Sequence, residues 1–152
     1  MKYTKFALLA LLGLFTGCEE YFAEKDSEPD GSKPYISVMS PANNSVFARN
    51  QNIEIESLLS DKDNIKELEV QIVKLNSESS FNTTTIDTTT SGNKAVWGFK
   101  KYPTQNPVII DTTVAASVLT AGNYLLVFNG IDGRTNVGTK EIKFTVNEVT
   151  GN

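Results

Sequence analysis

Short stretches in which apolar and polar side chains alternate recur through most of the chain. Ile53 and Ile55 alternate with glutamates, and Ile142, Phe144 and Val146 alternate with polar residues near the end. Because successive side chains of a strand point to opposite faces, this period of two predicts half-buried β-strands. We expect strands near the following ranges: 34–39, 52–59, 65–75, 108–110, 123–131 and 139–147.

The segments between these strands are rich in Asn, Asp, Gly and Ser, the residues typical of turns. The middle region, 81–113, is the least regular, and 81–90 has strand propensity but little to bury, which fits an edge ribbon or a long loop. No helical period follows residue 34 to support a parallel sheet. The pattern therefore predicts one all-β domain over 34–152, an antiparallel β-sandwich of about seven strands.

The first segment combines a charged start, an apolar run and small residues. Lys2 and Lys5 precede an apolar run over 6–15, and Gly17 follows it closely. This layout is typical of a secretory signal peptide, and the run is shorter than the about 20 residues that a membrane-spanning helix needs. We expect residues 1–17 to be a signal peptide.

The residues from Leu14 to Cys18, in the order Leu-Phe-Thr-Gly-Cys, resemble a bacterial lipobox. The resemblance implies a diacylglycerol on the Cys18 thiol and an acylated N-terminus, palmitate-type chains that together anchor a protein stably to a membrane. Cys18 is the single cysteine, so an internal disulfide is excluded for this chain. The alternative is a chance cysteine in an ordinary signal peptide.

Residues 18–33 form an acidic stretch with six acidic and two basic residues. Such a composition cannot bury enough apolar surface to offset its ordering entropy and predicts a flexible tether. Acidic residues directly after Cys18 also resemble the surface-export signal of Bacteroidetes-type lipoproteins, which implies an outer-membrane lipoprotein at the cell surface. The alternative is a merely solvated linker that carries no export signal.

Two further segments resemble bacterial immunoglobulin-like domains. The run 34–41 with 45–47 resembles their opening strand, and 119–124 resembles their tyrosine corner, with Tyr124 as the tyrosine. Asp132 and Asn136 match the turn after the following strand, although Thr135 stands where a glycine is usual. Over about 34–147 the chain is similar to short Bacteroidetes-type immunoglobulin-like lipoproteins of unknown function, which implies an immunoglobulin-like sandwich.

The composition excludes several functions. The chain has no His, which removes Ser-His-Asp and Cys-His catalysis, and its net charge of −4 argues against a nucleic-acid partner. Neither a nucleophile elbow nor a phosphate-binding glycine motif is present. The carboxylates of Glu67 and Glu69 are expected on one solvated strand face. We therefore expect no enzymatic activity.

Asp61, Asp63 and Asp132 are candidate ligands for Ca²⁺ and the only cofactor site that the sequence suggests. The loops that hold them lie at one end of an immunoglobulin-like sandwich, together with the N-terminal tether, and Ca²⁺ takes six to eight oxygen ligands. The alternative is that each Asp caps its own turn. Lys62 and Arg134, in the same loops, would oppose a cation.

Trp97 and Tyr102 are the candidate ligand-binding aromatics. Exposed on one flat face, they would stack on a sugar or on a partner's side chain. The alternative for Trp97, which shares a strand face with Phe99, is packing in the core between the sheets.

Thr88 and Thr112 are candidate O-glycan acceptors. Each lies in an Asp-Thr-Thr sequence that resembles the acceptor of exported Bacteroidetes-type proteins. The middle of the chain is rich in Thr, so chance matches are the alternative.

Together these features predict a lipid-anchored immunoglobulin-like module of the envelope or cell surface that binds or assembles with a protein partner. The alternative is an accessory module that binds carbohydrate through an aromatic platform.

Overall fold

Eight β-strands and one 3-10 turn form the described part of the chain. The computed structural model describes residues 29–75 and 94–149. The strands are β1 (Tyr35–Ser40), β2 (Ser45–Ala48), β3 (Asn52–Ser60), β4 (Ile65–Lys74), β5 (Lys94–Lys101), β6 (Val108–Ala115), β7 (Gly122–Asp132) and β8 (Val137–Asn147), and the turn η1 (Ala116–Val118) follows β6. No helix in these residues is long and apolar enough to cross a bilayer.

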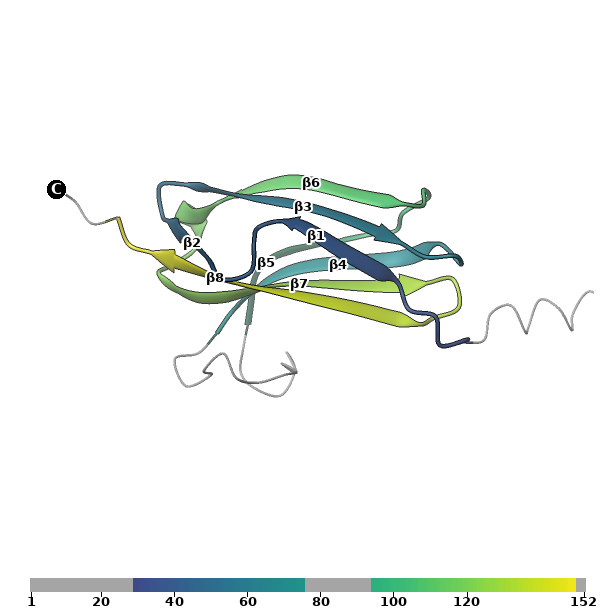
Figure 1. Cartoon of the computed structure of the whole chain (residues 1–152). Coiled ribbons are helices and arrows are strands. Elements are labelled where there is room, and N and C mark those ends of the chain that lie inside the picture. The colour runs from purple at the N-terminus through teal and green to yellow at the C-terminus, as the bar shows by residue number, and fades with distance from the viewer. Residues whose placement is uncertain (1–28, 76–93, 150–152) are drawn as a thin grey trace, which may run out of the picture.

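The strands form two sheets that face each other (Figure 1). One sheet has the order β1-β3-β6 and the other the order β2-β8-β7-β4-β5. Neighbouring strands are antiparallel except β2 and β8, which run parallel. The predicted all-β sandwich is confirmed, and one parallel pair and an eighth strand depart from the expected pattern.

The parallel pair arises because the chain changes sheets between β1 and β2. β1 pairs with β3, whereas β2 pairs with β8 of the other sheet. At the crossing, the N–H of Asn44 donates to the Lys143 carbonyl at 2.7 Å, and the Asn43 side chain accepts from the Lys143 N–H at 2.9 Å. β2 has four residues, too few for an alternation of apolar and polar residues to be recognised in the sequence.

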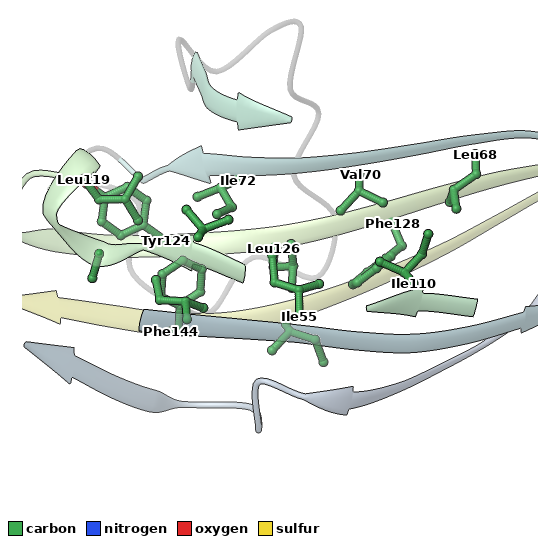
Figure 2. Packing of buried hydrophobic residues seen from close by; sticks show 14 of the residues in the cluster. Ile55, Leu68, Val70, Ile72, Ile110, Leu119, Tyr124, Leu126, Phe128 and Phe144 are labelled. Carbon is green, nitrogen blue, oxygen red and sulfur yellow. The ribbon is translucent and has the colours of Figure 1, made fainter. Parts of the chain in front are cut away.

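The inward side chains of both sheets form the core (Figure 2). In β3 the burial alternates as predicted, since Ile53, Ile55 and Leu59 are buried and the glutamates between them are exposed. The side chains from the facing sheet that complete this core include Leu68, Val70, Ile72, Tyr124, Leu126, Phe128, Ile142, Phe144 and Val146.

β7 is buried on both faces. Tyr124, Leu126 and Phe128 belong to the core between the sheets. Leu125 and Val127 form a second buried cluster with Val73 of β4 and with Leu75, which directly follows β4. A strand covered on both faces reads as a continuous apolar run, which is what residues 124–128 show.

The predicted strands 34–39, 52–59, 65–75, 123–131 and 139–147 correspond to β1, β3, β4, β7 and β8. The strand expected at 108–110 extends to residue 115 as β6. The ribbon or loop predicted for 81–90 lies outside the described residues.

Candidate functional site

Three loops and the segment before β1 meet at one end of the sandwich. They are the loops between β3 and β4, between β5 and β6, and between β7 and β8. Asp61, Asp63 and Asp132 come together here, because each offers a carboxylate oxygen within 4.8 Å of the others. The structure therefore brings these three predicted residues into one cluster.

Hydrogen bonds within the loops explain this arrangement. The fully buried Asp132 accepts from the N–H groups of Arg134 and Asn136 through Oδ1, both at 2.8 Å, and from Asn136 Nδ2 through Oδ2, also at 2.8 Å. Asp61 Oδ1 accepts from the Asp63 N–H at 2.9 Å. These short-range contacts from a carboxylate to the backbone stabilise turns.

The protein's own cations pair with the carboxylate of Asp63. Arg134 Nε lies 3.2 Å from Asp63 Oδ2, and Lys62 Nζ lies 3.9 Å from the same oxygen. A Ca²⁺ ion needs six to eight oxygens, and Arg134 and Lys62 already place positive charge beside Asp63. The geometry favours turn capping and ion pairing over a calcium site for Asp61, Asp63 and Asp132.

The β3–β4 and β7–β8 loops also meet backbone to backbone. The Gly133 N–H is shared between the carbonyl oxygens of Asp63 and Asn64, each 3.2 Å from the nitrogen. A Cβ atom at Gly133 would lie 2.5 Å from the Asp63 oxygen. Only glycine allows the two loops to approach this closely.

Part of the stretch predicted as a flexible tether, 18–33, is held against this end of the sandwich. Asn136 Oδ1 accepts from the Gly31 N–H and Asn136 Nδ2 donates to Asp30 Oδ1, both at 3.1 Å. Lys62 Nζ lies 2.5 Å from Asp30 Oδ2. Composition alone does not predict such contacts, because they join residues far apart in the sequence, more than a hundred positions in the case of Asn136.

The Asp30 contact gives a prediction about acid titration. Hydrogen bonds from Lys62 and from the Ser32 N–H hold the pKa of Asp30 at about 2, below its usual 3.8. We expect Lys62→Ala to raise this pKa part of the way toward 3.8, measured from the ¹³C shift of the carboxyl carbon. Because the pKa is lowered in the folded chain, the stabilisation from this contact is present above about pH 4 and is lost as the pH falls to about 2.

The matched control is Lys66→Ala, at an exposed position with no described contact to Asp30. It should leave the Asp30 pKa at about 2. An unchanged pKa in Lys62→Ala would show that the ion pair does not hold the segment.

Trp97 and Tyr102 do not share a face. Trp97 and Phe99 lie opposite Ile72 and Val70 of β4, pack against the core while half-buried, and meet edge to face with ring centroids 5.6 Å apart. Tyr102 follows the end of β5 and is 69% exposed. The flat aromatic platform expected for a glycan-binding module is therefore not formed, and Trp97 takes the core position that was its alternative.

A shallow groove of about 420 Å³ follows β5. Six consecutive β5 residues, Ala95–Lys100, line it together with Glu69 and Gln71 of β4. Glu69 and Gln71 lie opposite Lys100 and Gly98, and directly opposite residues share a face of the sheet. The groove therefore lies over β4 and β5, on the face turned away from the core. It is a candidate binding site.

A β-bulge shapes this groove. The pairing between β4 and β5 shifts between Ile72 and Val73, so that Val96 has no partner and is 47% exposed. The sequence carried one signal of the irregularity, Gly98 within a strand pattern. A Cβ atom at Gly98 would lie 2.7 Å from the Val70 carbonyl oxygen, so glycine is needed for the close approach of the two strands.

Of the predicted modification sites, the structure describes Thr112. Thr112 lies in β6 opposite Ile55, on the same side as the buried Ile110 and Val114, and is half-buried. An O-glycan needs an exposed hydroxyl, so this position does not suit one. Thr88 and Cys18 lie outside the described residues.

Tyr124 has the geometry of a tyrosine corner. Its hydroxyl donates to the Thr120 carbonyl oxygen at 2.6 Å, four residues upstream. The ring stacks on Phe144 with centroids 5.4 Å apart. The turn from η1 into β7 is thus tied to the core.

No protein-family model matches the chain, and no curated protein does. Among solved structures it is similar to fibronectin(III)-like modules of Clostridium thermocellum CbhA, with 13% identity, a TM-score of 0.44, and coverage of 77% of this chain and 48% of that one. It is also similar to a beta-glucosidase from Listeria innocua, with 7% identity, a TM-score of 0.41, and coverage of 75% and 16%. The chain therefore spans about half of the first structure and about one sixth of the second, and at these identities the likeness concerns the fold alone.

Proposed function

We propose that this chain is a non-catalytic immunoglobulin-like module that binds a protein partner at the cell envelope or surface, held there by a lipid on Cys18. The observation that carries the proposal is the groove along β5. Its lining combines the exposed Val96 and the half-buried aromatic residues Trp97 and Phe99 with polar residues, and aromatic residues are enriched in protein interfaces.

The surroundings of Glu67 and Glu69 support a non-catalytic role. Lys100 Nζ donates to Glu67 Oε1 at 2.6 Å, and Gln71 Nε2 donates to Glu69 Oε1 at 2.9 Å. Both carboxylates are thus engaged in surface contacts with neighbouring side chains, as expected for a solvated strand face.

Photo-crosslinking in cells of the native host tests the proposal. With a photoreactive amino acid in place of Val96, we expect a discrete adduct that protease removes, because this exposed residue lines the groove. Val118, 66% exposed at η1, is the matched control position and should give none. An adduct that resists protease but is destroyed by periodate would instead assign the module to a glycan.

The same experiment tests the anchor. With Cys18→Ala the protein should leave the membrane fraction and the adduct from position 96 should weaken, because anchor and partner are then no longer held at one surface. Equal adducts at positions 96 and 118, or none at either, would contradict binding at the groove.

A further inference from the structure

The outer edge of β5, beside the groove and on the side away from β4, offers a specific mode of binding. Within residues 29–75 and 94–149, β5 is the last strand of its sheet and pairs with β4 alone. The outer edge of such a strand presents unpaired N–H and C=O groups to which an extended segment can add.

The regular part of this edge is short. The bulge at Val96 interrupts the ladder, and from Trp97 to Lys101 each β5 residue again faces one β4 residue, from Ile72 to Leu68. An added strand would pair along these five residues. Its inward side chains would cover the parts of Trp97 and Phe99 that are still exposed.

The positive charge of β5 favours an acidic partner. The strand carries three lysines and no acidic residue: Lys94, Lys100 and Lys101. Lys100 is paired with Glu67, whereas Lys101 Nζ lies 5.2 Å from the centre of the Phe99 ring, on the inner side of the sheet opposite Leu68. Lysines on an edge strand oppose pairing with a basic or identical strand, and carboxylates opposite them would be favourable.

We propose that the partner presents an extended acidic segment that adds to β5 as a further antiparallel or parallel strand, with a carboxylate near Lys101 and apolar residues over Trp97 and Phe99. This inference rests on the proposed function and names the chemistry of the partner. The other long edge strand, β6, carries Asp111 and no lysine, so it lacks this selectivity for acidic segments.

Trp97 is the only tryptophan of the chain, and its fluorescence therefore reports on this edge directly. The probe is the acetylated and amidated peptide Glu-Glu-Val-Glu-Val-Glu-Glu, which in either direction presents two Val and a flanking Glu on one face. It is titrated into the full chain at low salt. We expect a saturating blue shift as the added strand excludes water from the indole ring. The same peptide with Lys in place of Glu, and the acidic peptide with N-methylated amides, should give no shift.

The double variant Lys94→Glu/Lys101→Glu should weaken binding of the acidic peptide about tenfold and should gain binding of the basic one. The matched control, Lys33→Glu/Lys140→Glu, makes the same change of net charge at exposed positions outside β4 and β5 and should stay within about twofold of the parent. Thermal melts verify that each variant is folded.

A shift of equal size with acidic and basic peptides, or with the N-methylated peptide, would overturn strand addition, and so would the absence of any shift. A protein crosslinked at Val96 together with no peptide response would leave the binding function in place and reject only this mode. Loss of both would reject the function as well.

Discussion

Replacing Asp132 with Ala is expected to destabilise the folded domain by about 3 kcal/mol. The carboxylate is fully buried and accepts three hydrogen bonds from Arg134 and Asn136. Its removal leaves buried donors without an acceptor, and it also frees the side chain of Asn136 that contacts Asp30 and Gly31. Urea denaturation followed by circular dichroism measures the loss.

Asp111→Ala is the control for this prediction. It removes the same charge from an exposed position in the middle of β6 and should change the free energy of unfolding by less than about 0.5 kcal/mol. Similar values for the two variants would mean that the β7–β8 turn does not depend on its buried carboxylate.

Phe144→Ala is expected to cost about 4 kcal/mol. The side chain is fully buried, stacks on Tyr124 with centroids 5.4 Å apart and meets Phe47 edge to face at 6.0 Å. Truncation would remove apolar contacts with β2 and β7 at once and leave a cavity that the surrounding strands can only partly close. The midpoint of urea unfolding should fall accordingly.

Tyr124→Phe separates the ring stack from the hydrogen bond. This variant keeps the ring against Phe144 but loses the bond from the hydroxyl to the Thr120 carbonyl, which should cost about 1 kcal/mol. If Phe144→Ala cost no more than Tyr124→Phe, the aromatic stack would not be a main support of this part of the core.

Strands could be predicted from the sequence where apolar and polar residues alternate or where an apolar run is continuous. β3 shows the alternation of isoleucine and glutamate directly, and residues 124–128 of β7 are apolar at every position. The change of sheet between β1 and β2 was not predictable in the same way. It depends on contacts of Asn43 and Asn44 with Lys143, a hundred residues further on, and a period of two carries no such information.

The candidate sites, like the strands, could be predicted only in part. The convergence of Asp61, Asp63 and Asp132 followed from the expected topology, because loops at one end of a sandwich must meet. The sequence pattern does not show which cations pair with these carboxylates, or that Asn136 contacts Asp30. Both depend on side-chain geometry. The groove was missed because it results from a bulge in the pairing of β4 and β5, and of that bulge the sequence shows only Gly98.

The contact of Asp30 with Lys62 and Asn136 fixes where the chain leaves the sandwich. This is the end of the sandwich at which β5 finishes, and β8 finishes at the opposite end (Figure 1). In a chain held through residues 18–29, a pull from a partner on β5 would run along the strands, so the hydrogen bonds of the β4–β5 ladder would share the load in shear. Under shear the hydrogen bonds of a ladder break together, whereas in a ladder pulled apart from one end they break one at a time. The position of one aspartate would thus determine how firmly a tethered module resists being stretched.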